Sequence, residues 1–270
     1  MNLFLDVCQE VAREAGTLLL HYYERRVDFE LKGEFDLVTE ADRASEKLVV
    51  ERLRACYPQH AIVAEEGGRH EGSSEYRWYV DPLDGTTNFA HGFPMFNVTL
   101  ALERSGDLIA GVIYDPLRDE MFAAERGGGA FLNGRRIRVS RAKRLQDCLV
   151  ATGFPSRKRH LNVNVHFYHQ LAMATHGVRR GGSAALDLAY VGCGRLDGFW
   201  EFGLKPWDMA AGTLLVSEAG GAVSDMRGGA ANLRRPHVLA DNGLIHGQML
   251  ELFGEIFAGK YRVPLPQITS

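Results

Sequence analysis

Two aspartates three residues apart form the part of this sequence that is best suited to chemistry. Asp81 and Asp84 follow the apolar residues 78–80, which we expect to form a buried strand. Gly85 and Thr86 come directly after them. Carboxylates and hydroxyls are hard oxygen ligands, and Mg²⁺ is bound by one or two carboxylates together with substrate phosphate oxygens. A glycine and a threonine that open a helical turn also offer backbone N–H groups to an anion. The segment therefore predicts phosphoryl chemistry supported by a metal ion.

Other acidic residues occupy comparable places in the sequence. Glu65 follows the apolar residues 61–64, Glu201 follows an aromatic pair, and Asp208 stands at the start of an expected helix. In proteins with α/β sheets, small molecules and ions bind beyond the carboxyl ends of the strands. The first turn of a helix also favours acidic residues because of the helix dipole. For any one of these residues, this structural explanation is about as good as a role in a site. That explanation is much weaker for all five acids together, and we expect them to meet at one site.

Composition excludes several classes of protein. The chain has 270 residues, 46% of them hydrophobic and 24% charged, which is ordinary for a globular protein of one or two domains. A net charge of −3 argues against nucleic-acid binding through bulk electrostatics. Four widely spaced cysteines favour buried reduced thiols over a disulfide framework. These are Cys8, Cys56, Cys148 and Cys193.

Targeting signals are not expected. The first fourteen residues carry Asp6, Glu10, Arg13 and Glu14 within their apolar pattern, which is unlike a signal peptide. No run of 18 apolar residues occurs, so no membrane span is expected. A cytoplasmic location follows from these observations.

The elements that must position the acids change in character near residue 145. Before it, two helices and many strands are expected; after it, strands and helices alternate. The residues after Gly259 are expected to be loosely held. The expected helices cover 4–22, 40–56, 160–175, 183–191 and 206–219. The expected strands cover 27–31, 37–39, 61–64, 78–80, much of 96–131, 149–152, 178–180, 196–201 and 222–224.

The motifs, taken in order, resemble those of the inositol monophosphatase family over about residues 11–254. Residues 81–89 resemble its metal and phosphate signature, and 205–212 its C-terminal signature. Residues 64–66 resemble its Gly-Glu-Glu segment, with Ala64 in place of the glycine. Residues 37–42, residues 182–185 and Glu201 match further active-site positions.

The resemblance implies a fold and an assembly. The fold is of the α/β (α+β) class, with layers in the order α/β/α/β/α. An N-terminal α+β half, residues 1–145, carries most metal ligands, and a C-terminal α/β half, residues 146–270, carries Asp208 and substrate contacts. Both halves form one unit, and two copies of the chain form a homodimer.

The resemblance also implies a role for each site residue. Two or three Mg²⁺ ions per subunit are expected, the first held by Glu65, Asp81 and the carbonyl of Leu83, and the second by Asp81, Asp84 and Asp208. Thr86 and Asp42 orient the attacking water with help from Glu65. A loop carrying Lys32 contacts the site, although a solvated turn lysine explains that residue equally well. Substrate contacts are implied for Gly85, Thr86, Gly182, Ser183, Ala184, Glu201 and Asp208.

The activity implied is lithium-sensitive hydrolysis of inositol monophosphate, a small phosphorylated polyol. Fructose 1,6-bisphosphate, histidinol phosphate and 2′-phosphorylated nucleotides are alternative substrates for the same chemistry. The basic residues 157–159 would favour a bisphosphate, whereas Glu201 and Asp208 favour a polyol. A rival of another class is a non-catalytic regulatory protein associated with RNA or transcription. The intact set of acids argues against lost catalysis, and the negative net charge makes nucleic acid an unlikely partner.

Overall fold

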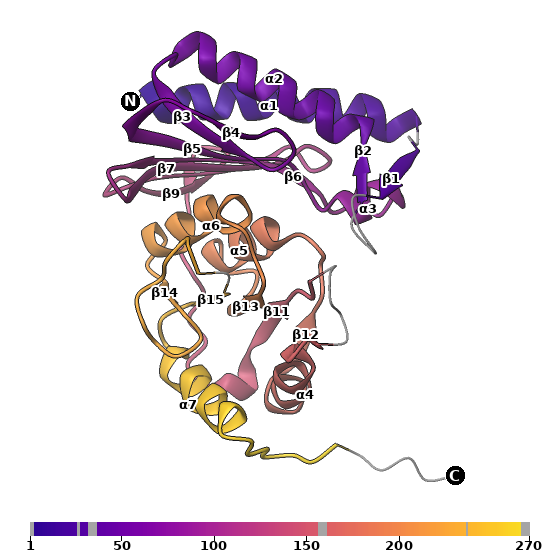
Figure 1. Cartoon of the computed structure of the whole chain (residues 1–270). Helices are drawn as coiled ribbons and strands as arrows, with labels where there is room; N and C mark the ends of the chain where they lie inside the picture. Colours follow the sequence, from indigo (N-terminus) through magenta and orange to yellow (C-terminus); the bar gives the residue numbers. More distant parts are fainter. Residues whose placement is uncertain (1–2, 26–27, 32–36, 156–160, 236, 266–270) are drawn as a thin grey trace.

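Five layers of helices and sheets stack on one another in this protein, as the computed structural model shows (Figure 1). The structure describes residues 3–25, 28–31, 37–155, 161–235 and 237–265. In Figure 1 the layers run from α1 and α2 at the top, through a first sheet, α5 and α6, and a second sheet, to α4 and α7 at the bottom. The expected α/β/α/β/α order is confirmed.

The first sheet is mainly antiparallel and has the strand order β10-β9-β8-β7-β6-β5-β3-β4. Only β3 and β5 pair in parallel within it. A separate two-stranded sheet joins β1 and β2. The elements of this part are α1 (Leu3–Arg25), β1 (Phe29–Leu31), β2 (Leu37–Thr39), α2 (Glu40–Cys56), β3 (His60–Ala64), β4 (Gly68–His70), β5 (Ser73–Asp84), α3 (Thr86–Ala90), β6 (Asn97–Arg104), β7 (Asp107–Asp115), β8 (Glu120–Glu125), β9 (Gly129–Leu132) and β10 (Arg135–Arg136).

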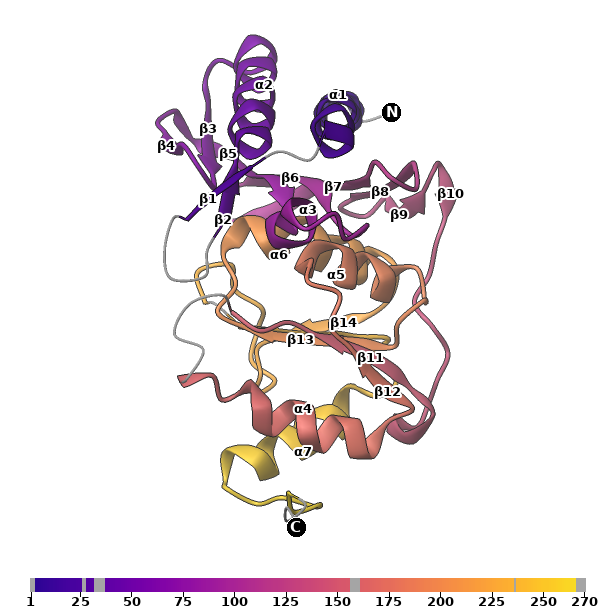
Figure 2. The ribbon, with the colours of Figure 1, turned by 90° about the vertical axis from the view of Figure 1, so that its right-hand side faces the viewer.

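The second sheet has the order β12-β11-β13-β15-β14, and β11 is parallel to both of its neighbours. Figure 2 shows α5 and α6 on one face of this sheet and α4 and α7 on the other. Its elements are the 3₁₀ turn η1 (Leu145–Asp147), β11 (Leu149–Thr152), α4 (Asn164–Ala174), β12 (Gly177–Arg179), α5 (Ala184–Gly192), β13 (Gly198–Phe202), α6 (Pro206–Glu218), β14 (Ala222–Ser224), β15 (His237–Asp241) and α7 (His246–Phe257).

Each contact between neighbouring layers contains its own apolar core. Val11 and Leu19 of α1 pack with Trp78 of the first sheet, which is fully buried. Alanines of α5 and α6 fill the contact between that sheet and the middle layer. Trp200 of β13 lies in the core beneath α4 and α7. Burial of apolar surface on both sides of each sheet therefore holds the strand ends of the two sheets in fixed positions.

Several C-terminal elements differ from expectation. Strand β15 and helix α7 were not expected, although Met249, Leu252, Phe253 and Ile256 have helical spacing and are buried. Helix α4 begins only at Asn164, four residues later than predicted. The expected strand at residues 78–80 is the end of a longer strand, β5.

The segment after Gly259 is held in place over residues 259–265, so the expectation of a loose tail is wrong there. The side-chain amide of Gln170 donates to the Val263 carbonyl (2.6 Å) and accepts from the Val263 N–H (3.1 Å). His166 stacks on Tyr261. Amide and ring contacts from α4 thus fix this segment to the helix surface.

All four cysteines are free, and Cys8 and Cys148 are buried. Cys56, the last residue of helix α2, is exposed, so the expectation of buried thiols is wrong for this residue. None of the helices within the described ranges combines the length and the apolarity that a bilayer span needs.

Candidate metal and phosphate site

The carboxyl end of β5 supplies two carboxylates with a defined geometry. The pairing of β5 with β6 is irregular between Asp81 and Asp84. Pro82 lies in this interval and has no N–H to donate to a neighbouring strand. The Leu83 N–H instead donates to Asp81 Oδ1 (3.1 Å). The buried Asp81 carboxylate is thereby anchored through one oxygen.

Asp84 connects the first sheet to helix α5 of the middle layer through hydrogen bonds. Its Oδ2 accepts from the Asn97 side-chain amide (2.9 Å), the Ser183 hydroxyl (2.6 Å) and the Ala185 N–H (2.9 Å). Asn97 begins β6, whereas Ser183 is the N-cap of α5 in the middle layer. Ser183, predicted as a substrate contact, thus lies against a predicted metal ligand.

Thr86 and Asp42 form a hydrogen-bonded pair. The Thr86 hydroxyl lies 2.9 Å from Asp42 Oδ1 and 3.0 Å from the Leu83 carbonyl oxygen. Asp42 is fully buried in the first turn of α2, where its Oδ2 accepts from the Thr39 N–H (2.8 Å) and hydroxyl (2.6 Å). The helix cap therefore uses one oxygen of Asp42 and leaves the other for Thr86.

Gly85 precedes the short helix α3 and has a φ of 92°, which glycine adopts without strain. A Cβ at this position would lie 2.8 Å from the Met95 carbonyl oxygen, so no larger residue fits. Gly182 has a φ of 85° in the turn before α5. Both glycines that the sequence singled out thus occupy turns that need left-handed backbone.

Glu65 lies half-buried in the turn between β3 and β4. Glu46 of α2 fixes this turn, because its carboxylate accepts from the N–H groups of Glu66 (2.7 Å) and Gly67. Ala64 is buried in the regular strand β3, paired with Val80 and Gly68. Alanine at this position therefore fits a regular strand and needs no glycine-specific backbone.

Asp208 and Glu201 approach from the second half of the chain. Asp208 lies in the first turn of α6, where its Oδ2 accepts from the Lys205 N–H (2.7 Å). Glu201 is buried near the end of β13. A Cβ on Gly153 would collide with the Glu201 carboxylate, so glycine at the end of β11 leaves room for it.

The carboxylates share one electrostatic environment. Burial raises the pKa of Asp81 well above its usual value, and the charges of Glu65, Asp84 and Asp208 raise it further. Burial likewise raises the pKa of Asp208; the Lys205 N–H opposes this shift, and the charges of Asp84 and Glu65 add to it. Burial also raises the pKa of Asp84, against hydrogen bonds from Ser183 and Asn97 that lower it. Four of the predicted metal ligands are therefore close enough to repel one another.

The oxygen atoms of these carboxylates, together with the Leu83 carbonyl, are ligands that a hard divalent cation prefers. This donor set consists of oxygens alone, and a cation would relieve the repulsion among the buried carboxylates. Among the described residues, hydrogen bonds reach one oxygen of Asp81 and one oxygen of Asp208, which leaves the other oxygen of each for a ligand. Within the described ranges, however, no group of three or more His, Cys, Asp or Glu side chains stands in the geometry of a metal cage.

The sequence profile of the inositol monophosphatase family matches residues 2–258. This chain belongs to that family. It is 50% identical over 250 residues to the Nus factor SuhB of Pseudomonas aeruginosa, covering 90% of this chain and 92% of that protein. It is 48% identical over 252 residues to the inositol-1-monophosphatase of Mesorhizobium japonicum, covering 92% and 94%. The crystal structure of the extragenic suppressor protein suhB from Bartonella henselae superposes with a TM-score of 0.90, at 44% identity over 93% of this chain and 98% of that chain.

Sequence reasoning missed three polar residues around this family site: Glu46, Asn97 and Asp187. Asp187 is buried in α5, and burial together with the charge of Asp84 raises its pKa well above the usual value. Its signal in the sequence was a single carboxylate in an otherwise apolar helix. Lys32 and the basic residues 157–159 lie outside the described residues, so their expected contacts remain predictions.

Proposed function

We propose that this protein is a Mg²⁺-dependent phosphomonoesterase that hydrolyses inositol monophosphate to inositol and phosphate. The observation that carries the proposal is the meeting of Asp81, Asp84, Glu65 and Asp208 beside the hydrogen-bonded pair of Thr86 and Asp42. Membership of the family and 48% identity to a relative named inositol-1-monophosphatase support the same chemistry.

Metal binding is proposed for Glu65, the carbonyl of Leu83 and the three aspartates Asp81, Asp84 and Asp208. Mg²⁺ bound there would lower the pKa of a water and offset the negative charge of the phosphoryl group. Because the Thr86 hydroxyl donates to Asp42 or to Leu83, its lone pairs face outward as acceptors. Thr86 is therefore suited to accept a hydrogen bond from the attacking water and to orient it.

The two ends of the substrate would bind to different elements. We assign the phosphate to the backbone N–H groups of Gly85 and Thr86, where the turn into α3 brings main chain close to the carboxylates. We assign the polyol hydroxyls to Glu201, Asp208 and the backbone of residues 182–184 before α5. Carboxylates and carbonyl groups accept hydrogen bonds from hydroxyls, which favours a polyol over an apolar alcohol.

The test is phosphate release from a panel of phosphomonoesters, with and without Mg²⁺ and with added Li⁺. The panel contains inositol 1-phosphate, fructose 1,6-bisphosphate, histidinol phosphate and adenosine 2′-monophosphate. Asp84→Asn should lower kcat at least about 100-fold, because the removed charge would bind the metal and offset phosphoryl charge. Asp107→Asn, an exposed aspartate at the start of β7, serves as the matched control.

Mg²⁺-dependent turnover with inositol 1-phosphate as the best ester is the expected result. A preference for another ester would support the proposed mechanism but would identify that ester, and not inositol 1-phosphate, as the substrate. A folded protein without turnover on any ester would contradict the proposal. We also infer a homodimer from the family, which sedimentation equilibrium would test as a mass of twice 30.0 kDa.

A second candidate function is a regulatory role in association with RNA, which the name Nus factor of a 50% identical relative brings into consideration. One feature of this chain favours it. Five cations within nine residues are exposed along the segment that leads from the first sheet to the second, and none forms an ion pair with a described residue. Such a local basic strip can attract a polyanion although the whole chain is negative. The strip consists of Arg135, Arg136, Arg138, Arg141 and Lys143.

Fluorescence anisotropy with single-stranded RNA at several salt concentrations would test this role. If the strip binds phosphates, Arg138→Gln combined with Arg141→Gln should reduce the slope of log K against log salt by about 1.4, roughly 0.7 for each contact. Arg69→Gln with Arg234→Gln removes the same charge from other exposed positions and should leave the slope unchanged. Binding without salt dependence, or equal effects of both pairs, would contradict the role.

A further inference from the structure

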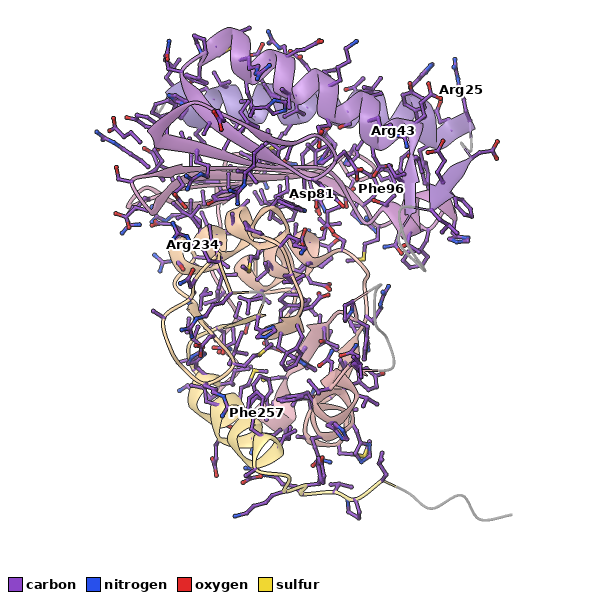
Figure 3. The ribbon with its side chains drawn as sticks, viewed as in Figure 1. Arg25, Arg43, Asp81, Phe96, Arg234 and Phe257 are labelled. Atoms are coloured by element: carbon purple, nitrogen blue, oxygen red, sulfur yellow. The ribbon has the colours of Figure 1, made fainter. Side chains whose placement is uncertain are left out.

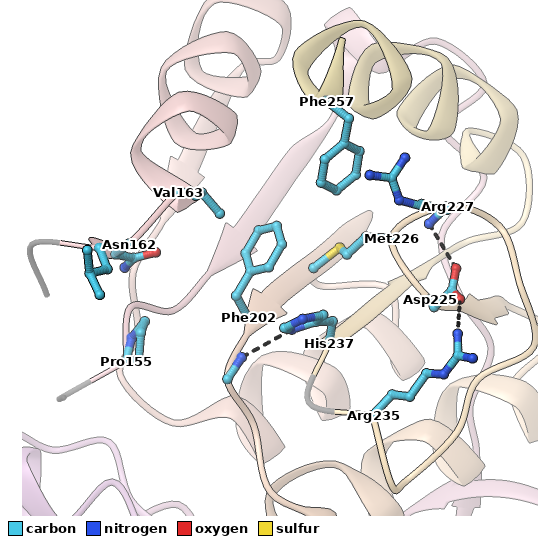
Figure 4. Close-up of a pocket in the computed structure, with 12 residues that line it drawn as sticks. Pro155, Asn162, Val163, Phe202, Asp225, Met226, Arg227, Arg235, His237 and Phe257 are labelled. Atoms are coloured by element: carbon cyan, nitrogen blue, oxygen red, sulfur yellow. Dashed lines mark hydrogen bonds and ion pairs between the residues drawn. The ribbon is translucent and has the colours of Figure 1, made fainter. Parts of the chain in front are cut away.

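A cavity of about 630 Å³ opens at the carboxyl edge of the second sheet, on the side covered by α4 and α7 (Figure 4). Its volume falls within the range of small-molecule sites. Phe202 and Met226 are buried among its lining residues, and Phe257 of α7 lies across from Val163. No residue that we assign to the phosphatase site lines this cavity.

The cavity lies behind the strand that carries Glu201. Successive side chains of a strand point to opposite faces of the sheet. Phe202 packs with Phe167 of α4 in the lower core, so it faces the cavity side. Glu201 faces the other way, toward Asp187 of α5, whose charge raises its pKa in addition to burial. Neighbouring residues of β13 thus face the cavity on one side and the candidate phosphatase site on the other.

The mouth of the cavity exposes large apolar side chains. The side chain of Leu161 is 66% exposed and that of Val163 is 49% exposed. Both line the cavity, whose buried lining residues Phe202 and Met226 are also apolar. The His237 ring meets Phe202 edge to face, with 5.2 Å between the ring centroids. Exposed aromatic rings can form further edge-to-face or offset-stacked contacts with a ring of a ligand.

The charges of the cavity favour an anion. Asp225 accepts hydrogen bonds from the N–H groups of Arg227 and Gly229, which lower its pKa, and pairs with Arg235 at 3.3 Å. The Arg227 guanidinium stacks 4.0 Å above the Phe257 ring, and no carboxylate of the described residues pairs with it. Two arginines against one aspartate leave the lining with one net positive charge. Stacking also leaves the N–H edge of Arg227 open to an oxyanion.

We propose that this cavity binds a small anion built on a flat aromatic ring. The ring contacts Phe202 and Phe257, and the anionic group pairs with Arg227. An aromatic carboxylate and a nucleotide share this chemistry. The proposal stands independently of the phosphatase function.

Three indoles that differ in charge provide the first test, by calorimetric titration of the metal-free full-length protein. Indole-3-acetate should bind at least about tenfold more tightly than indole, because only the anion pairs with Arg227, and the cation tryptamine should bind most weakly. Adenosine 5′-monophosphate and adenosine then separate the two sources: tighter binding of the nucleotide than of indole-3-acetate would identify a nucleotide site.

Paired variants locate the binding. Val163→Trp should fill the mouth and abolish binding, whereas Val165→Trp, equally exposed on the same segment but outside the cavity, should not. Arg227→Gln should reduce the affinity of the anion to that of indole, whereas Arg234→Gln, outside the cavity lining, should leave it unchanged. No binding of any anion, equal affinity for the three indoles, or equal effects of a variant and its partner control would overturn the proposal.

Discussion

Folding raises the pKa of Glu201, a residue of the candidate site, to about 8. Burial is the main cause, and the charges of Asp187 and Asp84 add to it. The same side chain in an unfolded chain titrates near 4.5. Between these values the folded protein keeps a proton that the unfolded chain releases. The contribution of Glu201 to the free energy of unfolding therefore falls as the pH rises from about 4.5 to about 8.

Glu201→Gln should remove the contribution of this residue to the pH dependence of stability, because the amide stays neutral at every pH. In metal-free protein we expect the melting temperature of the variant to exceed that of the wild type at pH 8, by about 2–4 °C for each kcal/mol of repulsion removed, and to exceed it by much less at pH 5, close to the pKa of the unfolded side chain. Glu71→Gln changes an exposed residue between β4 and β5 and serves as the control. Differential scanning calorimetry measures both. An equal gain at pH 5 and pH 8 would contradict the assigned cause.

Residue types and local spacing were sufficient to single out most of the carboxylates that the structure brings together at the candidate site. Asp42, Asp81, Asp84 and Asp208 each stand at a strand end or in a first helical turn, which are positions that sequence patterns can identify. Asn97 was missed because its hydrogen bond to Asp84 depends on how β6 pairs with β5, which no local pattern contains.

At the scale of elements, the first turns of two helices hold two acids of the candidate site in place through hydrogen bonds. Asp42 accepts from the Thr39 N–H in α2, and Asp208 accepts from the Lys205 N–H in α6. In each case the first-turn acid caps its own helix and still points the rest of its carboxylate toward the site. Because capping follows from local sequence, both helix starts were predicted within one residue.

The elements that sequence reasoning placed poorly are those that depend on neighbours. Helix α4 begins late, and Leu161 and Val163 just before it remain exposed beside the cavity. The turn that carries Glu65 takes its shape from Glu46, which lies nineteen residues earlier on α2. Side-chain contacts between separate elements decide such features, and periodicity does not report them.

At the scale of the whole molecule, the proposed ligands can meet only if the first sheet and the middle layer of helices keep a fixed distance, because each layer supplies some of them. Figure 3 labels Asp81 where the first sheet faces that layer. Asp81 and Asp84 belong to the first sheet, whereas Asp208 belongs to α6 in the middle layer. Helix α6 packs very closely on β7 at Gly111, where an added Cβ would lie 2.9 Å from the Cα of Ala211 and 3.2 Å from its Cβ. The nearest atoms belong to Ala211 and are mostly backbone atoms, which cannot rotate away. A side chain at position 111 could therefore be accommodated only if α6 moved away from the sheet.

Gly111→Ala should therefore cost about 1–3 kcal/mol of stability through overpacking, which lowers the melting temperature by about 2–4 °C for each kcal/mol. It should also reduce phosphate release, because a shift of α6 carries Asp208 away from Asp81. The matched control is Gly254→Ala in α7, where nothing lies within 4 Å of an added Cβ. That variant should be as stable as the wild type or gain up to about 1 kcal/mol, with activity unchanged. If both alanine variants kept full activity and stability, close packing of α6 on β7 would not be what sets the distance between the proposed ligands.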